Sequence, residues 1–474
     1  MDEDMDFDAN ATQPTPQYHH RQEYYDGRKM LDLVFVQDCT GSQGSYISSA
    51  TKNIEEICAH IFESGKLQSQ EDLRVGLVAF RDHPPQDHTY VVKNFGFSSD
   101  ISKVHRDLAG LYASGGGDGP EAVTAALAEA LHMDWREHAS KMVVLIADAP
   151  PHGIGEYGDG FDEGSPDGHD PLQLVREMAS RGITLFFVAC EPALSGYSVG
   201  SSSLVCDKYL EMFQYATDFY QAITTITSGL MLPLTTADLL SHAIVGSVLE
   251  NLDMERLVRE VGHAVAQRIL GNNESVDDVA RELHEKLLLR NESTKKVVIE
   301  SIYKESPEAM HNVSVFTHAA SLHEAKSQLK RVQGTRFTEK YLIARQTANR
   351  SLYSYPYSPH TPSRAEKSYS SMTPSTSPSA APASPPRKVV TDFAAFGAPK
   401  NASVFGTAVA STPFSLAGGK AAFGGIRNAG RVLVDEDDED DDDGRQRVEL
   451  REDSISLDQA RRIAMQSAWR SARG

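Results

Sequence analysis

Short apolar runs alternate with segments of helical spacing in the first half of the chain. Three runs, Leu31–Gln37, Lys141–Ala147 and Ile183–Cys190, are apolar at nearly every position. Strands that are buried on both faces have this pattern, and strands that alternate with helices indicate a parallel sheet. We therefore predict an α/β fold built on a doubly wound, mostly parallel sheet. The further expected strands are Leu73–Phe80 and Thr89–Phe95, and the expected helices are Ser45–Phe62, Pro120–Met133 and Pro171–Ser180.

Beyond the sheet-forming part, the chain changes character several times. Residues 236–345 keep apolar positions at helical spacing, and we expect four or five helices that pack on the sheet domain or form a small bundle. A tract of Ser, Pro, Ala and Gly follows, with too little apolar surface to offset the entropy of ordering. The predicted segments are a disordered acidic arm (1–28), the sheet domain (29–235), the helical region (236–345), a low-complexity linker (346–434), an acidic run (435–443) and a candidate amphipathic helix (454–474).

The C-terminal segment carries its own helix signals. Ser456 and Gln459 have the spacing of a capping box, and apolar residues from Leu457 to Ala464 share one helix face. Because the linker and the acidic run precede this helix, we expect it to stay separate from the folded parts. It would then order in the groove of a partner. A clamp with the acidic run and plain disorder are the alternatives.

Composition and charge exclude several classes of function. The chain has 474 residues, with 46 Lys+Arg and 66 Asp+Glu, and a formal net charge of −20. This argues against a nucleic-acid binder, which normally shows a basic footprint. The sequence has no apolar run long enough for a membrane span and no signal peptide at its acidic start. Its four widely spaced cysteines fit a reducing compartment. We expect a cytoplasmic or nuclear protein.

The strongest chemical signal is a candidate metal site. The run Asp38-Cys-Thr40-Gly-Ser42 directly follows the first strand and presents one carboxylate and two hydroxyls at alternate positions. These hard oxygen donors suit Mg²⁺ or Mn²⁺. With a single carboxylate in the turn, the ion keeps Lewis acidity for an incoming anion. Asp148 follows the strand Lys141–Ala147 and reaches the same edge, where ligands of parallel α/β sheets bind.

These residues resemble the metal-ion-dependent adhesion site of von Willebrand factor A domains. The DCTGS turn is similar to the first of three loops, Gly115–Glu121 (GGGDGPE) to the second, and Ala147–Pro150 (ADAP) to the third. The run Phe80-Arg81-Asp82-His83 resembles the corresponding sequence in one branch of this family, which includes hemicentin and the A domain joined to α-kinases. The resemblance covers about residues 30–232.

The resemblance implies a role for each site residue. Asp38, Thr40 and Ser42 would hold one Mg²⁺ or Mn²⁺ or its waters, Asp118 would bind directly or through water, and Asp148 would act mostly through its contacts with these groups. A carboxylate of a protein ligand would fill the open position. Asp118 stands where the family often has Thr, and its charge should raise cation affinity while weakening the attraction for an acidic ligand. The residues expected to contact the partner are Gly41, Gly117, Pro120 and His152.

We interpret the chain as an intracellular adaptor without catalysis of its own. One alternative is a regulatory relative of the α-kinase group without a kinase domain, and another is a metal-dependent hydrolase with Asp118 as its base. A dehalogenase-type phosphatase would need a second Asp at Thr40, and no dinucleotide or P-loop motif is present. The Gly-rich acidic segment 152–170 is expected to be a mobile loop, with a second cation site as the alternative. His83, His88 and His152 are expected at the surface rather than on zinc.

Overall fold

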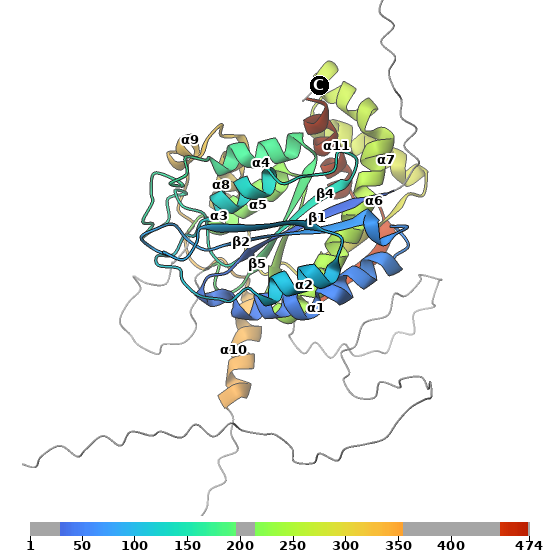
Figure 1. Cartoon of the computed structure of the whole chain (residues 1–474). Coiled ribbons are helices and arrows are strands. Elements are labelled where there is room, and N and C mark those ends of the chain that lie inside the picture. The colour runs from blue at the N-terminus through green and yellow to red at the C-terminus, as the bar shows by residue number, and fades with distance from the viewer. Residues whose placement is uncertain (1–28, 196–213, 354–445, 473–474) are drawn as a thin grey trace, which may run out of the picture. The chain divides into compact units, whose positions relative to one another are not determined.

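The computed structural model describes residues 29–195, 214–353 and 446–472 (Figure 1). The predicted acidic arm (1–28), nearly all of the linker and the acidic run (435–443) lie outside the described residues. Among the helices of the described ranges, none combines the length and the apolar character that a membrane span requires.

A six-stranded sheet forms the centre of the fold. Its strand order is β3-β2-β1-β4-β5-β6; β3 is antiparallel to β2 and the other neighbours are parallel. The predicted class is therefore confirmed, and β3 is an antiparallel edge that begins three residues later than we expected. The strands are β1 (Leu31–Asp38), β2 (Leu73–Phe80), β3 (Val92–Ser98), β4 (Ser140–Ala147), β5 (Ile183–Cys190) and β6 (Met231–Leu234).

Helices cover both faces of this sheet (Figure 1). Along β1, Val34 and Val36 join the apolar cluster on one face, whereas Leu33 and Phe35 join the cluster on the other. Such strands must be apolar at every position because no face meets water. The first face carries α3 (Val123–Leu131), α4 (Pro171–Ser180) and α5 (Ala216–Ile226), and the second carries α1 (Gly44–Glu63), α2 (Ile101–Ala109) and α6 (Leu240–Ala266).

The segment 236–345 packs on the sheet domain and does not form a bundle of its own. Helix α6 contacts α1, and α8 contacts α5. This segment also contains a strand, β7, that helical spacing did not predict. After α6 and a π-helical turn at Gln267–Gly271 come α7 (Val276–Leu289), β7 (Ser293–Ile299), α8 (Pro307–His318), α9 (Leu322–Lys326) and α10 (Glu339–Tyr353).

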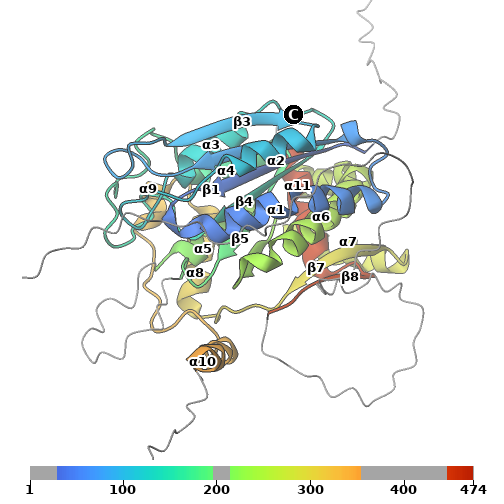
Figure 2. The same ribbon diagram turned by 60° about the horizontal axis from the view of Figure 1, so that its bottom comes forward.

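The C-terminal segment is part of the fold, so the expectation of a separate docking helix is wrong. Strand β8 (Val448–Ser454) pairs antiparallel with β7, and helix α11 (Leu457–Ser471) packs on α6, α7 and α4 (Figure 2). The capping box of Ser456 and Gln459 is present. Of the apolar face predicted for a partner, Ala460, Ile463 and Ala464 are buried in one cluster with residues of α6 and α7, whereas Leu457 at the start of the helix is exposed.

Candidate metal centre

Asp38 ends β1 and is fully buried at the carboxyl edge of the sheet. Its Oδ1 atom accepts hydrogen bonds from the backbone N–H of Thr40 at 2.8 Å and from the Thr40 hydroxyl at 2.7 Å. Its Oδ2 atom has no hydrogen-bond partner among the described side chains. Ser42 is exposed in the same turn. The turn therefore holds one carboxylate oxygen in place and leaves the other available for a cation.

Asp148 follows β4, which lies next to β1 in the sheet, and is buried beside Asp38. Burial raises the pKa of Asp38 to about 8, and repulsion from Asp148 adds to the shift. Burial also raises the pKa of Asp148, although the Ser42 hydroxyl counteracts the rise. The two buried carboxylates thus repel each other when both are ionised, and a bound cation relieves this repulsion.

In the second loop, Glu121 is the acidic residue that Asp38 repels most strongly. Burial raises the pKa of Glu121 to about 11, and the largest added effect is repulsion from Asp38. The Glu121 N–H donates to Pro150 O at 2.9 Å, and the next residue donates to Arg81 O at 3.0 Å, so the loop is held between the extensions of β4 and β2. The Glu121 Oε2 atom has no hydrogen-bond partner in the part of the chain that the structure describes. Sequence reasoning included Glu121 in the GGGDGPE motif but gave it no role.

The glycine loop lets these carboxyl groups approach closely. Gly115 and Gly116 both have φ of +83°, a conformation that side chains rarely adopt. A Cβ atom on Gly116 would lie 2.7 Å from Glu121 Oε1, and one on Gly115 would lie 1.7 Å from Asp87 Oδ2. The Gly41 N–H donates to Gly115 O at 3.2 Å and ties this loop to the DCTGS turn. The loop thus sets the position of Glu121.

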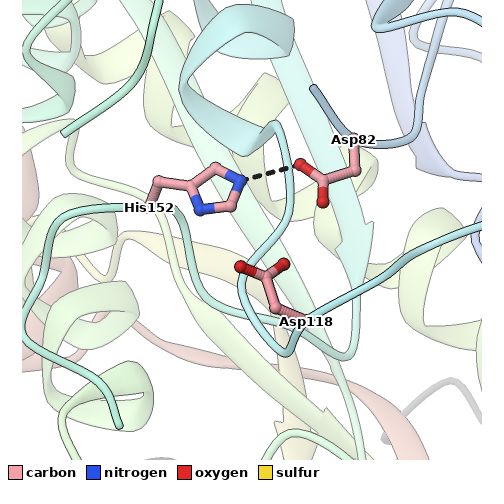
Figure 3. Close-up of side chains that lie close together, drawn as sticks. All are labelled: Asp82, Asp118 and His152. Carbon is pink, nitrogen blue, oxygen red and sulfur yellow. Dashed lines mark hydrogen bonds and ion pairs between the residues drawn. The ribbon is translucent and has the colours of Figure 1, made fainter. Parts of the chain in front are cut away.

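Asp118 lies in a neighbouring group with Asp82 and His152 (Figure 3). His152 Nε2 is 2.7 Å from Asp82 Oδ1, and His152 Nδ1 is 2.8 Å from Asp159 Oδ1. Burial alone lowers the pKa of His152, but its bonds to Asp159 and Asp82 outweigh this effect and raise the pKa to about 9. Asp82, to which the sequence pattern assigned no role, is buried like His152 and links the end of β2 to this group.

Two of the three histidines expected at the surface are buried. His83 and His152 are covered, and only His88 is exposed. Of the four residues predicted to contact a partner, Gly41 and Gly117 are exposed, whereas Pro120 and His152 are buried. Gly41 and Gly117 are therefore accessible from solvent, whereas His152 is covered and contacts the carboxylates of Asp82 and Asp159.

The acidic loop 152–170 uses most of its carboxylates for its own structure. Asp159 binds His152 and the backbone N–H groups of Gly153 and Phe161. Asp170 caps α4 and also accepts from the backbone N–H of Leu322. Asp162 pairs with Lys326, and Asp167 accepts from the His169 N–H. These contacts favour a structural role over a cation site within the loop itself.

The donor set around Asp38 fits a hard divalent cation. The residues Asp38, Thr40, Ser42, Glu121 and Asp148 offer only oxygen donors, as Mg²⁺ and Mn²⁺ prefer. Asp38 Oδ2 and Glu121 Oε2 are buried and have no hydrogen-bond partner among the described residues. A buried carboxylate without a partner is costly, so the arrangement favours an ion that neutralises both.

Without divalent cations, we expect these groups to destabilise the protein as the pH rises. The folded-state pKa values of Asp38, about 8, and Glu121, about 11, exceed their ordinary values of 3.8 and 4.5. Their contribution to stability is therefore fully present near pH 4 and is lost as the pH rises, through about 8 for Asp38 and through about 11 for Glu121. Urea unfolding at several pH values, in EDTA and in Mn²⁺, measures this effect. Stabilisation by Mn²⁺ should grow from pH 5 to pH 8, and a gain independent of pH would contradict the assignment.

Comparison with protein families bears on the fold around this centre. Residues 32–226 match the model of the von Willebrand factor type A domain. This part of the chain is a von Willebrand factor type A domain. We call residues 32–226 the A domain. The match runs from β1 to the end of α5 and includes all three loops of the centre.

Two curated proteins are similar to the A domain region. The alpha-protein kinase vwkA of Dictyostelium discoideum is 32% identical over 161 residues, which is 33% of this chain and 25% of the kinase. A putative ariadne-like RING finger protein of Acanthamoeba polyphaga mimivirus is 28% identical over 210 residues, which is 43% of this chain and 18% of that protein. The similarity thus spans a quarter or less of the length of these relatives.

Two solved structures also align with the chain. The pilus adhesin SpaC of Lactobacillus rhamnosus GG, in an open conformation, aligns with a TM-score of 0.35 and 14% identity, over 48% of this chain and 30% of the adhesin. An aerotolerance-related membrane protein of Bacteroides fragilis aligns with a TM-score of 0.28 and 14% identity, over 46% of this chain and 98% of that protein.

Proposed function

We propose that the A domain binds a protein ligand through one Mg²⁺ or Mn²⁺ held by Asp38, Thr40, Ser42, Glu121 and Asp148. The chain would act as an adaptor without catalysis of its own. The observation that carries this proposal is the pair of buried, unpartnered oxygens, Asp38 Oδ2 and Glu121 Oε2, beside the hydroxyls of the DCTGS turn. The resemblance of the three loops to a metal-ion-dependent adhesion site supports the same assignment.

The edge around the centre suits contact with a protein. Ser42 and Gly41 are exposed, so one side of the ion is open to an incoming oxygen donor. Tyr157, in the loop after β4, is 91% exposed, and Tyr112, before the glycine loop, is 60% exposed. Exposed aromatic rings are enriched in protein interfaces, where they supply large contact areas. We infer that these two rings contact the partner beside the ion.

The charge of the centre bears on the partner's chemistry. With Asp38, Glu121 and Asp148 ionised, three negative charges face the two positive charges of the ion. Asp82 and Asp118 lie close enough to interact with Glu121 and add to the negative potential. The ion therefore attracts an acidic side chain more weakly than a centre with one carboxylate would, although a carboxylate stays the expected donor. An acidic donor should bind more tightly as ionic strength rises, because salt screens this repulsion.

Partner binding is expected to require the cation. Capture by the full chain should be lost in EDTA, restored by Mn²⁺, and lost in Thr40→Ala, because without the ion no bond joins the partner oxygen to the A domain. Affinity capture from cell extract, scored by mass spectrometry, compares these conditions. Thr51→Ala is the matched control, since the Thr51 hydroxyl only bonds Ile47 O within α1. Capture that persists in EDTA would place the interface away from this centre.

A regulatory role beside an α-kinase is the second candidate. The observation that favours it is the 32% identity with the alpha-protein kinase of Dictyostelium discoideum over 161 residues. In that case the captured partner should be a kinase or its substrate. A metal-dependent hydrolase is the third candidate, and Asp118 would be its base. Turnover of generic phosphoesters by the Mn²⁺-loaded chain tests this, and we expect none.

An intracellular location remains part of the proposal. Cys39, Cys58 and Cys190 are free thiols in the described part of the chain, and all three are buried. Free buried thiols are typical of reducing compartments.

A further inference from the structure

A cluster of two carboxylates and one imidazole lies beside the Asp38 centre. Ligand atoms of Asp82, Asp118 and His152 all lie within 4.8 Å of one another (Figure 3). Asp82 is fully buried, and its Oδ2 atom, which has no hydrogen-bond partner within the described ranges, points toward Asp118. Asp118 Oδ1 also lacks a partner among these described residues. Two carboxylate oxygens cut off from water and without donors thus face one space, which is costly unless a cation occupies it.

The imidazole is oriented as in a metal ligand. Asp159 Oδ1 lies 2.8 Å from His152 Nδ1, and Asp159 is itself held by the backbone N–H groups of Gly153 and Phe161. A histidine that binds a metal usually donates its second ring N–H to a carboxylate in this way, which fixes the tautomer. With the proton on Nδ1, the Nε2 atom has a free lone pair for an ion on the side of Asp82.

The loop after β4 encloses the cluster. The Phe161 ring stands edge-on to His152 at 4.8 Å and to His83 at 5.8 Å between ring centroids. The Gly160 N–H donates to Asp118 Oδ2 at 2.5 Å, so this loop crosses directly over Asp118. One oxygen of Asp118 is thereby positioned, and the other stays available. The aromatic wall limits access of water and strengthens electrostatic attraction to an ion.

We propose that Asp82, Asp118 and His152 form a second cation centre, distinct from the Asp38 centre, that takes a borderline divalent ion such as Zn²⁺ or Mn²⁺. Mixed nitrogen and oxygen donors suit these ions better than Mg²⁺. The ion replaces the proton between His152 Nε2 and Asp82 Oδ1, and that proton goes to solvent. Two donors bound to one ion at about 2.1 Å lie roughly 3 Å or more apart, so the 2.7 Å contact must lengthen slightly.

The second centre does not depend on the proposed partner binding, but it shares a neighbour with the Asp38 centre. Glu121 interacts electrostatically with Asp38 and also with Asp82 and Asp118. An ion in either centre therefore lowers the repulsion that Glu121 feels. We expect an ion bound in one centre to change the cation affinity of the other. Repulsion between the two ions lowers that affinity, and the reduced repulsion at Glu121 raises it.

Counting the ions bound by the wild-type chain and by full-length variants of it tests the second centre. We expect chelator-stripped wild type to bind two Mn²⁺ per chain in calorimetric titration, and Asp38→Ala, His152→Gln and Asp118→Asn to bind one each. Co²⁺ bound to Asp38→Ala should show the visible absorption of a nitrogen-ligated ion, and this signal should be absent in the double variant with His152→Gln. Asp159→Asn should weaken the second ion about 10- to 100-fold.

His83→Gln is the matched control, because His83 touches the same aromatic ring but contacts Ser165 through Nε2 at 3.4 Å. It should keep both ions, and circular dichroism in EDTA checks that each variant folds. One ion lost in Asp38→Ala and kept in His152→Gln would overturn the second centre alone. One ion lost in His152→Gln and kept in Asp38→Ala would support it and overturn the Asp38 centre. A wild type that binds only one ion, which both variants lose, would mean a single shared site and would overturn the inference, as would a wild type that binds none.

Discussion

Replacing Asp38 with asparagine is expected to abolish cation binding at the DCTGS turn and to stabilise the cation-free protein. Asp38 is fully buried, and its pKa is raised from 3.8 to about 8 by burial and then by repulsion from Asp148. At 1.4 kcal/mol per pKa unit, holding this group in the fold at pH 7 costs roughly 4 kcal/mol. Asparagine keeps an oxygen that accepts from Thr40 and removes the charge. A gain of a few kcal/mol in urea unfolding in EDTA, with loss of Mn²⁺ binding, is the expected result.

The substitution Asp32→Asn, at the other end of β1, is the matched control. It is expected to change the free energy of unfolding in the opposite direction. Asp32 is equally buried, but Arg74 and Arg136 neutralise it through hydrogen bonds of 2.7 to 3.0 Å. Removing one partner of a buried ion pair costs about 3 to 5 kcal/mol. Asp32→Asn should therefore destabilise the protein and leave Mn²⁺ binding intact. If both variants lose stability in EDTA, Asp38 is not strained by its carboxylate neighbours, and the cation assignment loses its main support.

Truncation of Arg462 is expected to lower the free energy of unfolding by about 3 to 5 kcal/mol. Arg462 of α11 is buried and pairs with Glu250 of α6, and its Nε donates to Ser228 O at 2.8 Å. Glu250 also accepts from the Val297 N–H of β7 at 2.8 Å. Arg462→Ala leaves this carboxylate buried with its charged partner removed. Urea unfolding measures the loss.

Two further variants make this prediction specific. Arg461→Ala is the control at the adjacent position, because Arg461 pairs with Asp277 at the surface, where both side chains are more than half exposed. Such pairs contribute about 0 to 1 kcal/mol. The double variant Arg462→Met with Glu250→Gln should lose less than the sum of its single variants, since neither buried charge then remains. Equal effects of Arg462→Ala and Arg461→Ala would show that α11 does not depend on this pair.

The hydrophobic pattern by itself predicted five of the sheet's six strands and three of the helices that cover it, α1, α3 and α4. Predicted bounds for Leu73–Phe80, Pro171–Ser180 and Ile183–Cys190 agree with β2, α4 and β5. A strand buried on both faces must be apolar throughout, so its sequence reveals it without tertiary information. β6, with four residues, and α2, a mixed polar helix, were too short or too polar for this signal. The antiparallel direction of β3 also depends on pairing that periodicity does not encode.

For the candidate centre, the sequence determined which loops meet, because the carboxyl ends of parallel strands share one edge. Only the tertiary structure decided which side chains join the Asp38 centre and which join the group around His152. Glu121 turns toward Asp38 because its backbone bonds Pro150, and its neighbour bonds Arg81, about thirty to forty residues away in either direction. Asp118 turns instead toward His152, under a loop that begins after β4. Such directions depend on long-range backbone contacts, and the spacing within GGGDGPE does not contain them.

The C-terminal helix shows the same division most clearly. Its existence follows from local signals, the Ser456 capping box and one apolar face, which act within a single turn or two. Its place in the fold follows from contacts across more than 150 residues: Ser293 pairs with Ser454 in the β7–β8 ladder, and Arg462 meets Glu250. An apolar helix face requires a covering surface but does not specify which one. That choice belongs to the tertiary structure, because shape and a buried charge partner together select the groove between α6 and α7.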